Sequence, residues 1–160
     1  NILHRDIKLD NIILDSKGVI KVGDFGVSKI VDPNQTMYDQ CGTPAYIAPE
    51  ILKDKGYKGF GIDIWSAGVV LYAMLYGTVP FRAQNMNELH DMIVKAKYTL
   101  KPEIGESARD LLKKILEPDP RKRITIPEIL NHVWFEDVDE NLEIFTDIEK
   151  DKIKQEFAYN

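Results

Sequence analysis

Apolar and polar positions along the chain follow one pattern in its first part and another from about residue 60 onward. Apolar blocks at 12–14 and 19–22 flank a polar tetrapeptide at 15–18 that ends in glycine, and this arrangement predicts a β-hairpin. From 27 to 46 no periodicity holds, while Asp, Asn, Gln and Pro are frequent. This stretch is predicted to be a long loop, and long loops in compact domains are usually functional.

The later part of the chain reads as helical. Residues 63–77 are apolar on nearly every side, which predicts a buried central helix that ends at Gly77. Capping boxes at 125–128 and 146–149 mark the starts of two short helices, and the stretch 136–143 before the second is strongly acidic. In all, helices are predicted at 63–77, about 87–97, 107–117, 125–131 and 146–157.

Composition narrows the class of protein. With 160 residues, 44% of them hydrophobic, and a net charge of −5, the chain is typical of one soluble globular domain. Its longest apolar stretch, 62–74, is too short to cross a bilayer, and its acidic balance argues against nucleic acid, so neither a membrane nor a nucleic acid is expected as a partner. The single cysteine, Cys41, excludes an internal disulfide and predicts a reducing compartment, the cytoplasm or the nucleus.

Four polar side chains near the start of the chain carry candidate chemistry. Asp6, Lys8 and Asn11 lie two and three residues apart, and Asp24 follows within Asp-Phe-Gly. Phosphoryl transfer needs a carboxylate for the hydroxyl proton, a cation on the transferred phosphate and oxygen ligands for Mg²⁺. Each carboxylate alone would more often cap a turn, but the four together in this order favour the functional interpretation.

These residues belong to a longer set of motifs, through which the chain resembles the C-terminal lobe of a eukaryotic-type Ser/Thr protein kinase. Within that family it looks most like the calcium/calmodulin-dependent group. The motifs are His4–Asn11, Asp24–Gly26, Gly42–Glu50, Asp63–Gly68, Arg123–Thr125 and His132–Phe135.

The resemblance implies a fold and a domain division. The fold would be mainly α, a helical bundle around a buried central helix with a small β-hairpin at the catalytic loop. Residues 1–135 would form the C-terminal lobe of the kinase domain, and 136–160 an acidic extension with a short helix. The chain contains no Gly-rich phosphate loop, so the N-terminal lobe is expected to be missing from it and the 160-residue chain alone to be inactive.

The resemblance also implies catalytic roles. Asp6 would be the catalytic base, Lys8 would contact the transferred phosphate, and Asn11 and Asp24 would bind Mg²⁺, with ATP as co-substrate. The expected function is ATP- and Mg²⁺-dependent transfer to Ser or Thr of protein substrates. A pseudokinase-like or scaffold fragment that binds a partner without catalysis is the alternative.

Substrate binding is assigned in the same way. Thr43 would contact both the base and the substrate backbone. Asp10 stands where relatives bind a substrate arginine, whereas Ala73 replaces a second acidic residue. A modest preference for basic residues upstream of the acceptor follows. The acidic tail contains no basic amphipathic segment, so no calmodulin site is expected in this chain.

The stretch between Asp24 and Glu50, the activation segment of the family, carries the expected regulation. In many relatives Arg5 pairs with a phosphothreonine three residues before the Gly of Gly-Thr-Pro. That position is Asp39. The sequence therefore predicts an Asp39–Arg5 contact without obligatory phosphorylation, with Thr36 and Tyr38 as further candidate phosphosites.

Three more residues resemble structural positions of the family. Glu50 and Arg123 would form the buried ion pair that ties the activation segment to the lobe. Asp63 would cap the central helix and hold the backbone of the catalytic loop.

Overall fold

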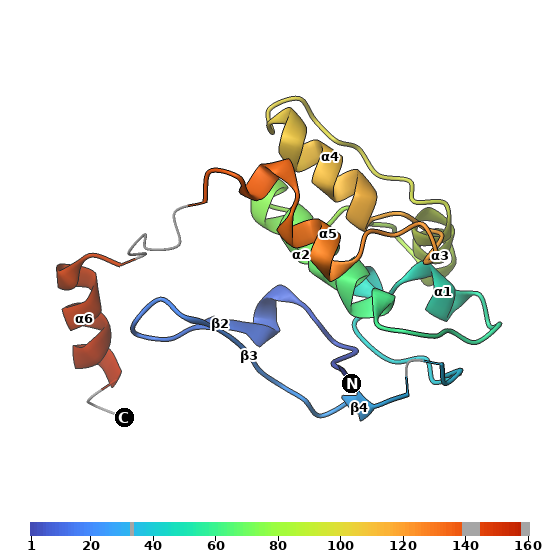
Figure 1. The fold of residues 1–160 in the computed structure, drawn as a ribbon, viewed down its shortest axis with the longest axis horizontal. Helices are drawn as coiled ribbons and strands as arrows, with labels where there is room; N and C mark the ends of the chain where they lie inside the picture. Colours follow the sequence, from blue (N-terminus) through green and yellow to red (C-terminus); the bar gives the residue numbers. More distant parts are fainter. Residues whose placement is uncertain (33, 139–144, 158–160) are drawn as a thin grey trace.

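The computed structural model describes residues 1–32, 34–138 and 145–157, and in Figure 1 a layer of helices lies above a β-hairpin and a long irregular segment. The strands are β1 (Ile2–Leu3), β2 (Ile12–Leu14), β3 (Ile20–Val22) and β4 (Lys29–Ile30). The helices are α1 (Pro49–Leu52), α2 (Gly61–Tyr76), α3 (Met86–Val94), α4 (Glu106–Ile115), α5 (Ile126–Leu130) and α6 (Asp147–Phe157). Short 3-10 helices are η1 (Leu9–Asn11), η2 (Pro44–Tyr46) and η3 (Val133–Phe135). The predicted mainly helical class is confirmed.

The predicted hairpin is confirmed as well. Strands β2 and β3 pair antiparallel, with Ile12 opposite Val22. Gly18 closes the turn with a φ of +78°, a conformation in which a side chain would be strained. At the open end the amide of Gly23 donates to the carbonyl of Asn11 at 2.8 Å. The hairpin therefore returns the chain to the end of the catalytic loop immediately before Asp24.

Helix α2 is the central helix that the apolar pattern predicted. Its Trp65 and Val69 are fully buried, and the Trp65 ring stacks on Phe81 with 5.6 Å between the ring centroids. Helix α4 crosses α2 at Gly68, where a Cβ atom would lie 2.3 Å from Cγ2 of Ile115. The two helices approach so closely because this position of α2 has no side chain.

One face of α2 departs from the predicted all-round burial. Its Met74 side chain is 68% exposed, and this face lines an apolar groove of about 530 Å³. Residues of the hairpin, α4, α5 and η3 form the other walls of this groove. The helix is therefore buried against α4 and the core but open toward the hairpin.

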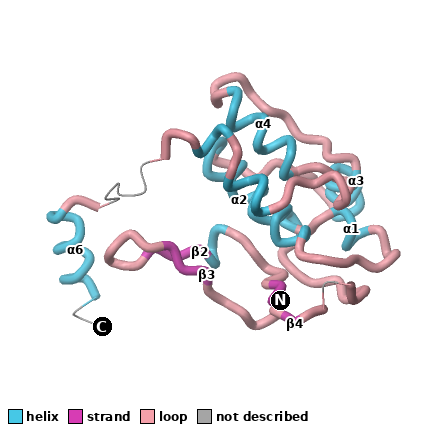
Figure 2. Tube along the Cα trace, viewed as in Figure 1, coloured by secondary structure: helices cyan, strands magenta, loops and turns pink. Residues whose placement is uncertain are grey.

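The long loop contains more structure than its sequence indicated. Its β4 pairs with β1, with Leu3 opposite Lys29, and Figure 2 shows both strands as short interruptions of a loop. An isolated antiparallel bridge joins Met37 to Tyr57 farther along. Strands of two residues and single bridges are too short to produce a visible alternation, so the sequence pattern could not reveal them.

The remaining helices lie close to their predicted positions. Helix α3 stops at Val94 and not near residue 97, because Ala96 adopts a φ of +47°. Both capping boxes are confirmed, with Thr125 and Thr146 donating their amides to Glu128 and Glu149 at 2.8 Å. Parts of the predicted acidic extension, 139–144 and 158–160, lie outside the described residues. Among the described helices, none has the length and apolarity that a membrane span requires.

Candidate active site

The catalytic loop, residues 4–11, is anchored on the first turn of α2. Asp63 accepts the backbone amide of His4 at 2.7 Å with one carboxylate oxygen and that of Arg5 at 2.9 Å with the other. These bonds hold Arg5 at a φ of +70°, a backbone conformation that non-glycine residues rarely adopt. Asp63 thus holds the loop as predicted, but it does not cap the helix: the N-cap position of α2 is Phe60, and Asp63 lies within the first turn.

His4 ties the catalytic loop to the residue before Asp24. Its Nδ1 accepts the amide of Asp6 at 3.2 Å, so the proton lies on Nε2, which donates to the carbonyl of Gly23 at 2.8 Å. The side chain is buried, and its ring contacts Phe25 edge-on with 4.8 Å between centroids. This histidine orients Asp6 and the Asp24 turn relative to each other.

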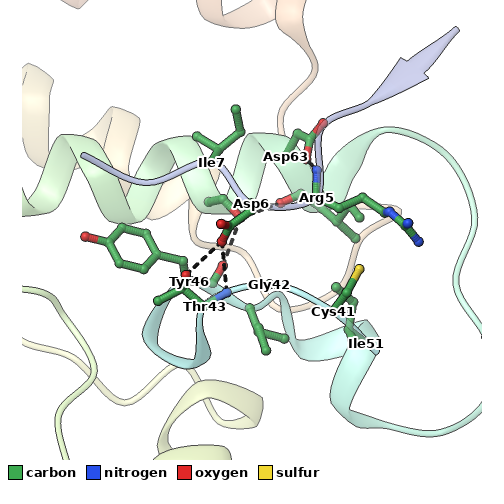
Figure 3. Close-up of a pocket in the computed structure, with 12 residues that line it drawn as sticks. Arg5, Asp6, Ile7, Cys41, Gly42, Thr43, Tyr46, Ile51 and Asp63 are labelled. Carbon is green, nitrogen blue, oxygen red and sulfur yellow. Dashed lines mark hydrogen bonds between the residues drawn. The ribbon is translucent and has the colours of Figure 1, made fainter. Parts of the chain in front are cut away.

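The structure brings the predicted Asp6, Lys8 and Thr43 together, and Figure 3 shows the contact between Asp6 and Thr43. Oδ1 of Asp6 accepts two hydrogen bonds from Thr43, one from the hydroxyl at 2.7 Å and one from the amide at 3.0 Å. Oδ2 of Asp6 lies 3.0 Å from Nζ of Lys8, which also donates to the Thr43 hydroxyl at 3.0 Å. A carboxylate, an ammonium group and a hydroxyl from two distant segments therefore form one cluster.

The electrostatics of this cluster favour the ionised pair. Partial burial alone would raise the pKa of Asp6, but the hydrogen bonds from Thr43 and Lys8 outweigh it and lower the pKa below its ordinary value. The hydrogen bond to Asp6 in turn raises the pKa of Lys8, and the charges of Asp10 and Asp24 add to the rise. At neutral pH Asp6 is thus a carboxylate that accepts hydrogen bonds and Lys8 a cation.

The two predicted metal ligands flank this cluster. Asn11 is buried and donates its amide nitrogen to the carbonyl of Asp6 at 2.9 Å, which leaves the amide oxygen as its candidate ligand atom. Asp24 adopts a φ of +56° and accepts the amide of Gly26 at 3.2 Å. Within the described residues no cluster of three or more His, Cys, Asp or Glu side chains could hold a metal ion. One carboxylate and one amide oxygen do fit Mg²⁺, which keeps several waters and binds phosphate oxygens.

The predicted contact between Arg5 and Asp39 is present. Nη1 of Arg5 lies 3.3 Å from Oδ2 of Asp39, and Lys29 approaches the same oxygen at 3.0 Å. These two cations lower the pKa of Asp39, Lys29 more strongly than Arg5. Sequence reasoning missed Lys29, because it lies in the stretch predicted to be structureless. No sequence signal marks it, because β4 has only two residues.

The other predicted residues take up separate places. Arg123 forms a bidentate pair with Glu50 at 2.6 and 2.9 Å, and both side chains are buried. Asp10 is exposed on η1. Burial raises the pKa of Tyr46, and the negative charge of Asp10 adds to that rise. Thr36 is half-buried, and Tyr38 is exposed.

Comparison with known proteins identifies the family. The family described as "Protein kinase domain" matches residues 1–135. The chain belongs to this family. Its helical architecture, with the hairpin at the catalytic loop, is that of the C-terminal lobe of a kinase domain, as the sequence predicted.

Curated relatives of the chain include protein kinases from plants. The chain is 45% identical over 139 residues to CBL-interacting protein kinase 16 of Oryza sativa subsp. japonica, matching 84% of the chain and 30% of that protein. It is 44% identical over 137 residues to CBL-interacting serine/threonine-protein kinase 9 of Arabidopsis thaliana, matching 84% of the chain and 31% of that protein. It is 46% identical over 136 residues to CBL-interacting serine/threonine-protein kinase 5 of Arabidopsis thaliana, matching 82% of the chain and 30% of that protein.

The chain spans about 30% of the length of these relatives. Their names refer to CBL, whereas the sequence motifs alone favoured the calcium/calmodulin-dependent group. The comparisons therefore establish the kinase family for this lobe. The relatives' names do not support the calcium/calmodulin-dependent group that the motifs favoured.

Proposed function

We propose that this chain is the catalytic lobe of an ATP- and Mg²⁺-dependent protein kinase that phosphorylates Ser or Thr of protein substrates. The observation that carries the proposal is the cluster of Asp6, Lys8 and Thr43, in which a carboxylate from the catalytic loop is bonded to the activation segment. In an undocked activation segment this bond could not form. The described conformation is thus the one in which the site is assembled.

In the proposed reaction the acceptor hydroxyl donates a hydrogen bond to Asp6. Its oxygen then bonds to the γ-phosphorus of ATP, the bond from that phosphorus to the bridging oxygen breaks, and the hydroxyl proton passes to the Asp6 carboxylate, leaving ADP. The lowered pKa makes Asp6 a weak base, which suffices because such a loose transition state depends mainly on positioning and charge. Lys8 supplies a positive charge beside the transferred phosphate. Mg²⁺, held by Asn11 and Asp24, would neutralise charge on the phosphates.

Partner and substrate are narrower proposals. The relatives' names support a CBL-type partner and a place among CBL-interacting kinases, in preference to the calmodulin-dependent group. Exposed Asp10 supports a modest preference for basic residues in the substrate, since Ala73 supplies no second charge. The alternative, a scaffold without catalysis, loses support because Asp6, Lys8 and Asn11 keep their side chains in one connected cluster.

A grafted kinase tests the proposal. In this chimera, residues of the chain replace the 137 matching residues of the Arabidopsis CBL-interacting kinase 9, and the unaltered kinase 9 is the positive control. We expect Mg²⁺-dependent transfer of radiolabelled phosphate to peptides with a Ser or Thr acceptor and none to the same peptides with Tyr. A folded chimera that binds ATP but transfers no phosphate would support the scaffold alternative instead.

A further inference from the structure

We propose that the loop between α1 and α2, residues 53–60, docks the activation segment, and that Tyr57 in this loop is a positioning residue for phosphoryl transfer. The proposal rests on the proposed function only for its catalytic part. Its structural part, that residues 53–60 fix residues 36–39 in place, stands on contacts within the described chain.

The docking begins with a backbone bridge. Met37 and Tyr57 exchange two hydrogen bonds, amide to carbonyl in each direction, both at 2.9 Å. Their side chains are 2% and 4% exposed and belong to the main hydrophobic core around α2. The activation segment is thus fixed by main chain and core together at a point six residues before Thr43.

Gly56 allows the two segments to meet at this distance. It has a φ of +73°, and a Cβ atom there would lie 2.6 Å from Cγ2 of Thr36 and 2.9 Å from the Tyr38 ring. A side chain at this position would be strained in its backbone and would collide with both neighbours of Met37. Residues 36–38 therefore lie directly against the backbone of the loop.

The hydroxyl of Tyr57 extends the docking toward the catalytic loop. It donates to the carbonyl of Asp39 at 2.9 Å, while the carboxylate of Asp39 is held by Arg5 and Lys29. Burial raises the pKa of Tyr57, and the neighbouring Arg5 guanidinium opposes that rise. Asp39 is consequently held at both its carbonyl and its carboxylate, beside the residue that precedes Asp6.

This arrangement gives the docking a role that phosphate has in many kinases. An exposed ion pair such as Arg5–Asp39 contributes little order by itself. The backbone bridge, the core contacts and the Tyr57 hydroxyl supply further order to the activation segment, and none of them requires phosphorylation. Four residues after Asp39, the segment reaches Thr43 and its bonds to Asp6. Loss of the hydroxyl should therefore loosen the segment and misplace Thr43, while the Tyr57 ring stays in the core.

Hydrogen exchange of the full 160-residue chain tests the docking. Tyr57→Phe removes only the hydroxyl, and we expect the amides of 36–42 to exchange about fivefold faster, as for loss of one hydrogen bond. Tyr72→Phe is the matched control, because Tyr72 is also buried and donates its hydroxyl to a carbonyl, that of Thr99 at 2.8 Å. Gly56→Ala should accelerate exchange over the same residues by steric conflict.

The docking is refuted if Tyr57→Phe and Gly56→Ala both leave residues 36–42 at the wild-type rate. It is equally refuted if Tyr72→Phe accelerates those residues as much as Tyr57→Phe does, because the effect would then be a general loss of stability.

The positioning role of Tyr57 in phosphoryl transfer is tested by steady-state kinetics of the grafted kinase. Tyr57→Phe should raise KM for the peptide about fivefold and leave KM for ATP unchanged, whereas Tyr72→Phe should change neither. A fall in kcat alone, with both KM values unchanged, would show only a smaller folded fraction and contradict the positioning role. If the unaltered grafted kinase transfers no phosphate, the proposed function fails, while the exchange measurement still decides the docking.

Discussion

At the scale of single residues, Asp6 is distinguished by the number of donors around one carboxylate. It accepts from the Thr43 hydroxyl and amide and pairs with Lys8, while Asn11 holds its carbonyl. These bonds keep the carboxylate ionised and in one orientation. An acceptor hydroxyl would therefore meet a fixed group.

The first prediction concerns the titration of Asp6. Its pKa is lowered in the folded chain, so its contribution to stability is present above the ordinary value of about 4 and is lost as pH falls through the folded value. NMR of the carboxyl carbon should give a midpoint below that of an ordinary Asp. Thr43→Val should raise the midpoint, because it removes the hydroxyl donor. An ordinary midpoint in the wild type would contradict the described geometry.

The second prediction concerns Asp39. In the grafted kinase, Asp39→Ala should lower kcat/KM about two- to fivefold, a modest effect because the pair is exposed, and phosphatase treatment should not abolish activity. Asp32→Ala is the control, since Asp32 lies in the same segment and its carboxylate accepts the backbone amide of Asn34 two residues on. If phosphatase abolishes activity while Asp39→Ala leaves it untouched, Thr36 or Tyr38 carries the switch.

The candidate catalytic residues could be found from the sequence, whereas the residues that hold them in place could not. Asp6, Lys8 and Thr43 lie in motifs whose spacing reflects the chemistry. Lys29 and Tyr57 act through a two-residue strand and a single bridge. No local pattern marks such contacts, because they depend on how segments about twenty residues apart meet.

At the scale of elements, the crossing of α2 and α4 is set by Gly68. A Cβ there would lie 2.3 Å from Ile115 and 3.1 Å from Leu116, both in the core. The helices and the hairpin were predictable because their apolar positions repeat and their turns and caps carry typical residues. The closeness of this crossing was not predictable, because the sequence does not show which residues of another helix pack against a glycine.

The third prediction follows from this crossing. Gly68→Ala should lower the free energy of unfolding by about 1–3 kcal/mol, the usual cost of overpacking a core. Gly61→Ala in the same helix is the control, because its Cβ would meet the nearest atom, of Arg123, at an ordinary 3.4 Å. Denaturant unfolding of both variants provides the comparison. Equal stability of the two would show that α4 moves away freely.

At the scale of the whole molecule, Arg123 joins parts of the chain that are far apart in sequence. It pairs with Glu50 and donates to the carbonyls of Gly61 at 2.9 Å and Glu117 at 3.0 Å. Its guanidinium also lies 5.1 Å from the ring centroid of Trp65. The end of the activation segment is thereby fixed to the helical lobe.

The fourth prediction tests this connection. Glu50→Ala should reduce the free energy of unfolding by about 3–5 kcal/mol, because it leaves the Arg123 charge buried without its carboxylate partner. Asp91→Ala, which breaks the exposed pairs with Lys95 and Lys97, should cost about 0–1 kcal/mol. Thermal or denaturant unfolding distinguishes the two. A cost for Glu50→Ala no larger than that of the control would show that the pair is not needed to hold the segment.

The central claim is that Asp6 accepts a hydrogen bond, and then the proton, from the acceptor hydroxyl during phosphoryl transfer. In the grafted kinase, Asp6→Asn preserves shape and removes the charge, while Asp15→Asn in the hairpin turn is the control, because an amide oxygen can still accept from the amides of Lys17 and Val19. Steady-state kinetics and nucleotide binding are measured for both. We expect Asp6→Asn to lower kcat by about 10²- to 10⁴-fold with the affinity for ATP unchanged. An Asp6→Asn enzyme with the kcat of the Asp15→Asn control, or one that has lost ATP binding instead, would contradict the assignment.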